Sequence, residues 1–186
     1  MIRFDNVTFG YGLKKPCIKE LSFEVPEGGN AMLFGRSGCG KTTVLRLVAG
    51  LEKPRAGIIE GTDGKTFSYV FQEDRLIPHM NVLENAALFA NEEIAKEYLC
   101  KLGLFENLES MPRELSGGMR KRVAIARALS CDFDILLLDE PFAGLDDDNK
   151  KSCAEIILAA AKDKTIIFAS HDINDAKTFG ATVIRI

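Results

Sequence analysis

Residues 35–43 read GRSGCGKTT, and they join the apolar run NAMLF at residues 30–34 to the stretch VLRLVAG at residues 44–50. The apolar run has the composition of a buried strand, and the stretch after the loop has the spacing of a helix. Glycines at such a junction let backbone N–H groups converge on an anion, and the helix N-terminus adds unpaired N–H groups. The pattern G-x-x-x-x-G-K-T between a strand and a helix therefore predicts a phosphate-binding P-loop. The alternative is a glycine-rich corner that serves packing alone.

This pattern assigns roles to the side chains of the loop. Lys41 is expected to reach the β- and γ-phosphates of a nucleoside triphosphate, and the Thr42 hydroxyl is expected to bind Mg²⁺. Thr43 is a second hydroxyl beside it. We therefore expect the nucleotide to contact the whole loop, which consists of Gly35, Arg36, Ser37, Gly38, Cys39, Gly40, Lys41, Thr42 and Thr43.

The apolar pattern changes along the chain. DILLLD at residues 134–139 and TIIFAS at residues 165–170 are almost continuously apolar, which is typical of parallel strands covered on both faces. IRFDNVTF at residues 2–9 alternates at first, with Ile2 and Phe4 on one side and Arg3 and Asp5 on the other, and LSFEV at residues 21–25 repeats the pattern. Such alternation is typical of half-exposed antiparallel strands. We predict an α/β fold with a parallel sheet and an antiparallel β subdomain. Helices are predicted at residues 41–50, 82–90, 92–102, 118–129 and 148–161.

The chain of 186 residues has the length of a single domain. Residues 78–113 are mostly helical and fall between two predicted strands of the sheet. We interpret them as a short inserted α-helical subdomain. Residues 1–77 and 114–186 would then form the core together with the β subdomain.

Composition excludes several classes of protein. The formal net charge of −3 provides no basic field that would recruit nucleic acid. The five cysteines form no C-x-x-C pair, which is typical of reduced thiols in the cytosol. The first residues lack the apolar segment of a signal peptide, and no apolar run reaches the roughly 18 residues that span a bilayer. We expect a soluble protein, for which a membrane-bound partner remains open.

Two acidic residues follow a predicted buried strand in ILLLDEP at residues 135–141. Asp139 is placed to hold Mg²⁺ directly or through water. Glu140 is then placed to polarise a water molecule in line with the γ-phosphate. This arrangement favours hydrolysis over transfer to another acceptor. The alternative is a pair of acids that cap the loop before Pro141.

A second glycine motif, LSGGMRKRVAIARALS at residues 115–130, precedes the acid pair. Ser116 is a favourable helix N-cap, and Gly117 and Gly118 expose the N-terminus of the helix to an anion. The motif resembles the signature sequence of ATP-binding-cassette (ABC) ATPases, and its distance from the acid pair fits that family. Taken alone, the same residues would pass as ordinary capping.

The resemblance to ABC ATPases assigns four further residues. Tyr11 in FGYG resembles the aromatic residue that stacks on adenine, and Gln72 in YVFQEDRLIP resembles the Q-loop glutamine that senses Mg²⁺ and the γ-phosphate. Asp146 in AGLDDD resembles the D-loop aspartate between partners, and His171 after TIIFAS resembles the switch histidine that contacts the γ-phosphate. Without the resemblance, Tyr11 would be a core residue at a strand end, Gln72 a loop amide and Asp146 a helix cap.

The resemblance also implies an activity and an assembly. It implies a RecA-like P-loop NTPase fold, ATP and Mg²⁺ as ligands, and a homodimer or paired cassette closed around ATP. It implies integral membrane permease subunits as partners, a solute-binding protein in the complex, and a peripheral position on the cytoplasmic face of the cell membrane. The subfamily that the sequence resembles most is that of nitrate, sulfonate and taurine importers. Catalysis would rest on Glu140, His171 and Gln72, and Mg²⁺ would be held by Thr42, Gln72 and Asp139.

Two departures and two alternatives accompany this interpretation. Residues 50–72 and the helical subdomain are both short for the family, which leaves less wall around adenine and less surface for a membrane subunit. One alternative is a soluble ABC-type ATPase that acts on nucleic acid or ribosomes, although such relatives carry long insertions or two cassettes. The other is a nucleotide-binding module without catalysis, which would lack Lys41, Glu140 or His171.

Overall fold

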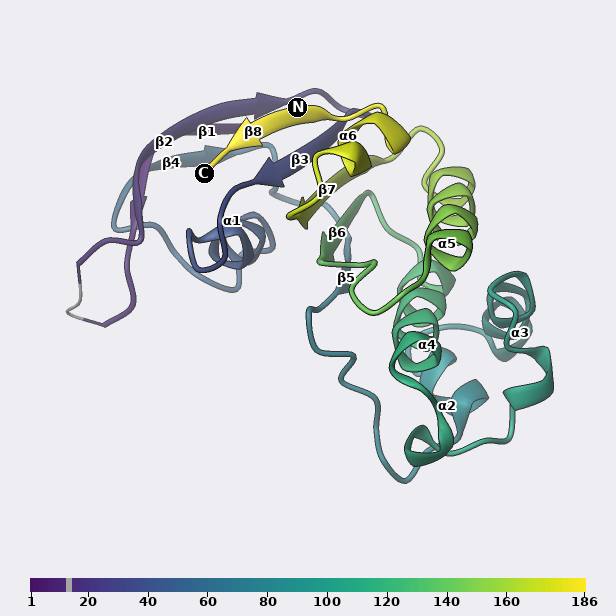
Figure 1. Cartoon of the computed structure of the whole chain (residues 1–186). Helices are drawn as coiled ribbons and strands as arrows, with labels where there is room; N and C mark the ends of the chain where they lie inside the picture. The colour runs from purple at the N-terminus through teal and green to yellow at the C-terminus, as the bar shows by residue number, and fades with distance from the viewer. Residues whose placement is uncertain (13–14) are drawn as a thin grey trace.

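Two β-sheets occupy the upper part of the molecule (Figure 1). The computed structural model describes residues 1–12 and 15–186. The smaller sheet contains β1 (Ile2–Phe9), β2 (Ile18–Val25) and β4 (Ala56–Glu60) in the order β2-β1-β4, and both pairings are antiparallel. This sheet is the predicted antiparallel β region.

The larger sheet contains five strands in the order β5-β6-β7-β3-β8, and every pairing is parallel. All residues of the central strands β6 and β7 are buried. The continuous apolar runs therefore form the interior of a parallel sheet, as the sequence predicts. The strands are β3 (Asn30–Phe34), β5 (Phe67–Val70), β6 (Ile135–Asp139), β7 (Thr165–Ser170) and β8 (Thr182–Arg185).

The helix α1 (Lys41–Val48) lies between the two sheets. Its apolar side chains share one core with strands of both sheets, including Phe4 of β1 and Leu137 of β6. This packing fixes the helix on both sides and sets its N-terminus at the carboxyl edge of the parallel sheet. The other face of the sheet packs on a second core that includes α4 (Gly117–Ser130) and α5 (Asp147–Ala160).

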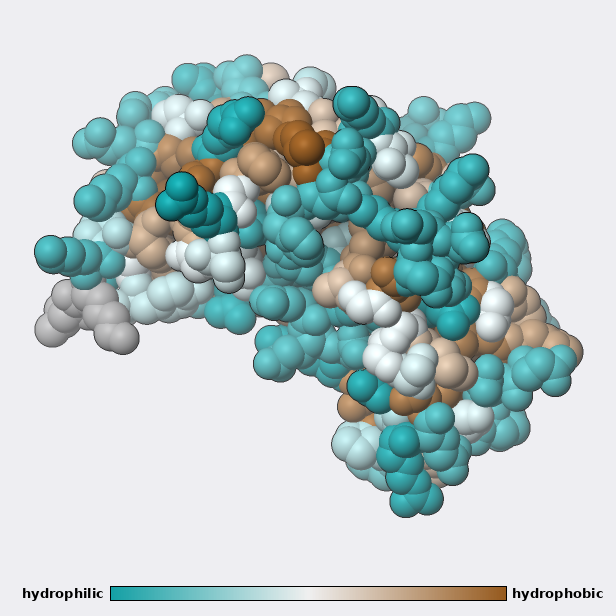
Figure 2. Space-filling model, in the orientation of Figure 1, coloured by the Kyte–Doolittle hydropathy of each residue, from teal (hydrophilic) through white to brown (hydrophobic). Residues whose placement is uncertain are grey.

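The helices α2 (Val82–Ala86) and α3 (Glu92–Lys101) pack against α4 in the lower right of Figure 1, away from α1 and the small sheet. Two short 3₁₀ segments, Phe105–Asn107 and Pro112–Glu114, connect α3 to α4, and α6 (Asn174–Thr178) precedes β8. The outline in Figure 2 is angled, with a concave side between the sheets and these helices. No helix in the described part of the chain is long and apolar enough to cross a bilayer.

One local prediction is wrong. The helix predicted at residues 82–90 ends at Ala86, because the chain turns at residues 87–90 and leaves Phe89 75% exposed instead of continuing an apolar face. The alternation predicted for the start of β1 is confirmed, and it breaks at Asn6, whose φ of 49° shifts the register against β2. The buried residues are therefore Ile2 and Phe4 before the break, and Val7 and Phe9 after it.

The turn before α2 depends on one buried amide. The Asn85 side chain accepts a hydrogen bond from the Ile77 backbone N–H at 2.7 Å. It also donates to the carbonyls of Ile77, Met80 and Asn81 at 3.1, 2.8 and 3.0 Å. Asn85 is completely buried, so water cannot replace these bonds.

We predict that Asn85→Ala lowers the free energy of unfolding by about 2–3 kcal/mol, since it leaves buried backbone groups without partners. Urea denaturation followed by circular dichroism measures this change. Asn107→Ala, in the 3₁₀ segment outside this cluster, should cost no more than about 0.5 kcal/mol. Equal urea midpoints of unfolding for the two variants would contradict the stabilising role of the Asn85 amide.

Candidate nucleotide-binding site

The predicted site residues of the core meet at the carboxyl edge of the parallel sheet. The P-loop follows β3, Gln72 follows β5, Asp139 and Glu140 lie at the end of β6, and His171 follows β7. Because the strands are parallel, their carboxyl ends share one edge, where α/β proteins bind ligands. A cavity of about 180 Å³ there is lined by Ser37, Gly38, Gly40, Lys41, Thr42, Thr43, Gln72, Asp139 and Glu140.

The loop backbone needs its glycines. Gly38 and Gly40 have φ values of 78° and 110°, a region that other residues rarely adopt. A Cβ at Gly40 would also lie 2.5 Å from Ile18 Cδ1, and a Cβ at Gly35 would lie 2.7 Å from Cys39 Sγ. Within the described part of the chain, no side chain caps the N-terminus of α1 and no acidic residue lies in its first turn. Its first N–H groups are therefore available to an anion.

Lys41 points into the loop that it follows. Its Nζ donates to the carbonyl oxygens of Gly35 at 2.9 Å and Arg36 at 3.3 Å, and it lies 3.8 Å from Glu140 Oε1. The side chain is only 8% exposed. A buried ammonium held by carbonyls and one carboxylate is suited to exchange these partners for phosphate oxygens.

Asp139 is 2% exposed at the end of β6. Burial raises its pKa, although a hydrogen bond from the Thr42 hydroxyl opposes this shift. A buried carboxylate beside a hydroxyl and the Gln72 amide offers oxygen ligands, which Mg²⁺ prefers. The described residues contain no group of three or more His, Cys, Asp or Glu side chains that could hold a metal ion. The donor set of Thr42, Gln72 and Asp139 consists of oxygen atoms, and it fits Mg²⁺.

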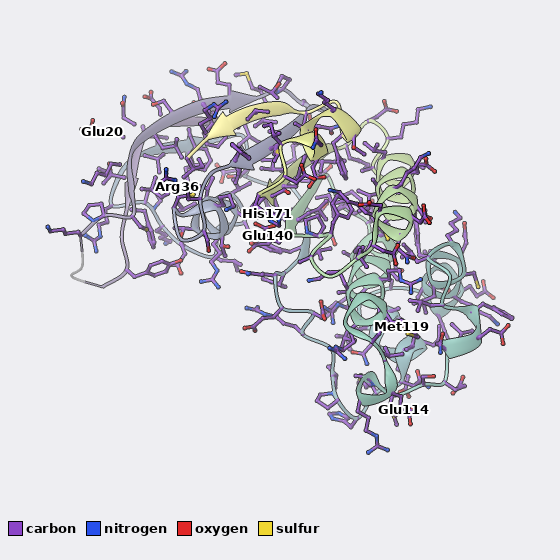
Figure 3. The ribbon with its side chains drawn as sticks, viewed as in Figure 1. Glu20, Arg36, Glu114, Met119, Glu140 and His171 are labelled. Carbon is purple, nitrogen blue, oxygen red and sulfur yellow. The ribbon has the colours of Figure 1, made fainter. Side chains whose placement is uncertain are left out.

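Glu140 has a strained backbone with a φ of 50°, and its N–H donates to the carbonyl of Ala169 in β7 at 3.0 Å. Its Oε2 lies 3.0 Å from Nδ1 of His171. Figure 3 shows the two labelled side chains together near the end of the sheet. The His171 side chain is 77% exposed, whereas that of Glu140 is 17% exposed. The Glu140 carboxylate therefore lies between a lysine and an imidazole at the carboxyl edge of the sheet.

Tyr11 lies beside the loop. Its hydroxyl is 3.2 Å from Oγ1 of Thr43, and its ring meets that of Phe9 edge-on at 5.0 Å. The side chain is 41% exposed, so Tyr11 is not the buried strand-end residue of the alternative reading. Five predicted residues near this edge do not line the 180 Å³ cavity: Tyr11, Gly35, Arg36, Cys39 and His171.

The signature tip, which we define as residues 116–118, lies elsewhere. Ser116 caps α4 by accepting a hydrogen bond from the Met119 N–H at 3.2 Å. A Cβ at Gly118 would lie 3.2 Å from the carbonyl oxygen of Gly144, so the tip packs on the segment before Asp146. Asp146 in turn caps α5 through the Asn149 N–H at 2.9 Å.

The tip is therefore separated from the P-loop of its own chain. Figure 3 labels Glu114 and Met119, which flank the tip, in the helical part of the molecule, and Glu140 and His171 in the sheet part. The predicted residues form two groups: one at the carboxyl edge of the sheet, and one at the N-termini of α4 and α5.

Lys121 was missed by the sequence analysis. It lies in α4, is 3% exposed, and donates to the carbonyl oxygens of Phe71 at 3.3 Å and Gln72 at 2.7 Å. Its Nζ also pairs with Oδ1 of Asp74 at 2.9 Å. This lysine fastens the loop that carries Gln72 to the helix that carries the signature tip. The only signal in the sequence is a lysine on the otherwise apolar face of a helix.

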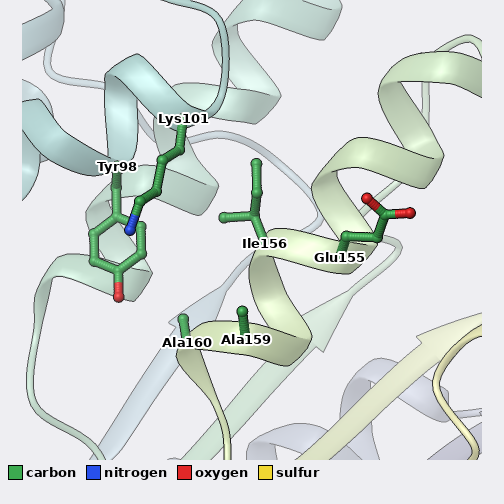
Figure 4. A pocket seen from close by; sticks show the side chains of 6 residues that line it. All are labelled: Tyr98, Lys101, Glu155, Ile156, Ala159 and Ala160. Carbon is green, nitrogen blue, oxygen red and sulfur yellow. The ribbon is translucent and has the colours of Figure 1, made fainter.

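A second cavity, of about 300 Å³, lies between α3 and α5 (Figure 4). It contains none of the predicted site residues, and its floor is largely apolar. Its lining residues are Tyr98, Lys101, Glu155, Ile156, Ala159 and Ala160.

The fold and the cavity at the P-loop define a P-loop nucleotide-binding protein. A protein-family model described as ABC transporter matches residues 18–143, which is more than half of the chain. The chain therefore belongs to the ABC transporter family, as an ATP-binding ATPase subunit, which confirms the resemblance.

Known proteins resemble the chain over most of its length. An aliphatic sulfonates import ATP-binding protein of Rhodococcus jostii is 38% identical, over 99% of this chain and 79% of that protein. A taurine import ATP-binding protein of Rhizobium johnstonii is 39% identical, over 94% of this chain and 73% of that protein. The solved dimer of the ATP-binding cassette MJ0796, in a post-hydrolysis state bound to ADP and Pi, superposes with a TM-score of 0.88 at 28% identity. The superposition covers 100% of this chain and 94% of the MJ0796 chain.

The raised pKa of Asp139 leads to a prediction on pH. A proton should compete with Mg²⁺ for this carboxylate at a higher pH than at an ordinary aspartate, whose pKa is 3.8. We expect the Mg²⁺ dependence of ATP binding to weaken as the pH falls, because the protonated form cannot bind the ion. The Mg²⁺ dependence is measured by adding Mg²⁺ to the protein and a fluorescent ATP analogue at several pH values.

Asp139→Asn should abolish most of this Mg²⁺ dependence at every pH. Glu140→Gln should keep the Mg²⁺ dependence, but it removes a neighbouring negative charge that raises the pKa of Asp139, so its pH profile should shift toward lower pH. An Asp139→Asn protein that still needs Mg²⁺ as strongly as the unmodified protein would refute the assignment.

Proposed function

We propose that the chain is the cassette subunit of an importer, in which two copies close around two ATP molecules and drive membrane permease subunits by hydrolysis. The observation that carries the proposal is the separation of the signature tip from the P-loop of the same chain. The tip offers the N–H groups of a helix N-terminus, yet its own nucleotide cavity lies on another element. A second copy, facing the first head to tail, supplies a triphosphate for it to contact. The dimeric state of the MJ0796 structure supports this arrangement.

Phosphate binding begins with Lys41. In the proposed complex its Nζ leaves the carbonyls of Gly35 and Arg36 and binds the β- and γ-phosphates, while the N–H groups of the loop and of α1 surround the same oxygens. Thr42, Asp139 and Gln72 would hold Mg²⁺. When bound, this ion neutralises phosphate charge and fixes the γ-phosphate. Tyr11 is then placed at the exposed side of the loop for stacking on adenine.

Hydrolysis is assigned to the pair of Glu140 and His171. Glu140 accepts a proton from the attacking water and orients it toward the γ-phosphate. His171 holds the Glu140 carboxylate through its ring nitrogen and contacts the γ-phosphate from the end of β7. Asp146 is proposed to contact the partner copy near the tip that it underlies.

The permease contact is proposed at a groove beside the edge strand β5. This groove, of about 680 Å³, is lined by apolar side chains such as Tyr69, Phe71 and Phe89, together with hydroxyl residues, two arginines and Asp132. Phe89 is largely exposed there, as expected of a residue covered in a complex.

The same proposal places the chain peripherally on the cytoplasmic face of the membrane, and it includes a solute-binding protein in the complex. Two of the similar proteins are import ATP-binding proteins for aliphatic sulfonates and taurine, which supports the importer assignment.

We predict that Glu140→Gln forms a stable dimer with saturating ATP and Mg²⁺, because the γ-phosphate contacts form while hydrolysis is blocked. Light scattering coupled to size-exclusion chromatography measures the mass. The double variant Lys41→Ala and Glu140→Gln is the matched control, and it should stay monomeric because it lacks the phosphate contact. A Glu140→Gln protein that remains monomeric with bound ATP would be incompatible with the proposed closure.

A further inference from the structure

A closed ring of polar contacts surrounds the chain segment of His171. Lys150 of α5 pairs through its Nζ with Oδ2 of Asp172 at 2.8 Å and with Oδ1 of Asp175 at 2.6 Å. Oδ2 of Asp175 accepts a hydrogen bond from the Ser170 hydroxyl at 2.6 Å. The Ser170 oxygen accepts from the Asp172 N–H at 3.1 Å, which closes the ring.

Burial makes the contacts of Asp175 costly to break. Asp175 is 2% exposed and Ser170 is 4% exposed, so water does not compete for the bond between them, whereas the side chains of Lys150 and Asp172 are 25% and 36% exposed. Removal of one partner from a buried ion pair leaves an uncompensated charge in the interior. Burial lowers the pKa of Lys150, but hydrogen bonds to Asp172 and Asp175 outweigh this effect and raise it above its usual value. Lys150 is therefore charged at neutral pH.

The ring bears directly on His171, because it contains both chain neighbours of this residue. Ser170 and Asp172 are fixed on either side, while the imidazole between them is exposed and lies 3.0 Å from Glu140. An exposed side chain has no packing of its own to define its direction. Apart from the contact with Glu140, its direction depends on the backbone. The sheet holds that backbone at Ser170, and Lys150 holds it at Asp172.

The ring also ties this loop to α5. Lys150 lies one turn after Asp146, and its N–H donates to the Asp146 carbonyl at 2.8 Å. The lysine thus connects the start of α5 to the loop of His171, and no interaction at the P-loop is needed for that connection.

We infer that Lys150 is a positioning residue for hydrolysis: it fixes the loop of residues 170–172 so that His171 meets the Glu140 carboxylate. This inference rests on the proposed roles of His171 and Glu140 in ATP hydrolysis. Lys150 itself does not line the nucleotide cavity. Its loss should lower kcat and leave ATP affinity unchanged, because the P-loop and Tyr11 lie outside the ring.

The chain offers a direct probe, since it contains only two histidines, His79 and His171. Their ring signals can be followed by ¹H–¹³C NMR in the nucleotide-free protein, so the measurement is independent of ATPase activity. Lys150→Met should shift or broaden the signal of His171 and leave that of His79 unchanged. Lys150→Arg, which keeps the charge, should restore the signal. Lys151→Met, at the exposed next residue of the same helix, is the matched control and should change neither signal.

The kinetic readout separates positioning from general damage. We expect Lys150→Met to lower kcat about tenfold or more, since small misplacement of a reacting group has effects of this size. Its ATP dissociation constant should stay within about twofold. If Asp175, left without a cation, prevents folding, the double variant Lys150→Met and Asp175→Asn keeps the Ser170 bond without a buried charge and should show the same two effects.

An unshifted His171 signal in a folded Lys150 variant, or an undiminished kcat, would overturn the inference. A parallel loss of kcat and ATP affinity would also overturn it, because that result indicates general damage. If the unmodified protein hydrolyses no ATP but its His171 signal still depends on Lys150, the proposed function fails and the structural link stands.

Discussion

The uniform direction of the five strands in the larger sheet is the constraint on which the rest of the structure depends. Parallel pairing brings the carboxyl ends of β3, β5, β6 and β7 to one edge, so residues far apart in the sequence meet there. This pairing brings Lys41, Gln72, Glu140 and His171 to the same edge. The central strands are buried on both faces, and α1 is held between two sheets. The edge is therefore rigid where a phosphate and a metal ion require fixed partners.

The same topology keeps one predicted element away from that edge. The signature tip begins α4, which packs on α2 and α3, while the P-loop begins α1 between the sheets. In the proposed dimer the two copies must move together, because each tip reaches the triphosphate of the other copy only after closure.

Charge-assisted hydrogen bonds contribute about 1.5–3 kcal/mol each. Two sites with two such bonds each exceed the approximately 5.5 kcal/mol that moves a two-state equilibrium from 1:99 to 99:1. Lys121 and Lys150 link the Gln72 and His171 loops to α4 and α5, so the nucleotide state is connected to both helices.

Much of this architecture is predictable from local patterns. The runs at residues 30–34, 134–139 and 165–170 predict the parallel sheet because burial on both faces leaves an unmistakable apolar sequence. The glycines of the P-loop predict its backbone. The register shift at Asn6 and the early end of α2 at Ala86 are not predictable, since they depend on tertiary packing. In the sequence Lys150 looks like an ordinary solvated charge, and Lys121 stands out only as a lysine on an apolar helix face. The fold is what brings carboxylates and carbonyls to them. The roles of the individual site residues remain predictions.

Complementation between two inactive variants tests the central claim most directly. Lys41→Ala removes the phosphate contact of one copy and leaves its tip intact, whereas Ser116→Arg blocks the tip and leaves the P-loop intact. A mixed dimer then contains one complete site, formed by the P-loop of the Ser116→Arg copy and the tip of the Lys41→Ala copy. The account predicts that the mixture hydrolyses ATP although each variant alone does not. A mixture as inactive as its components, at concentrations where the unmodified protein is active, would contradict it.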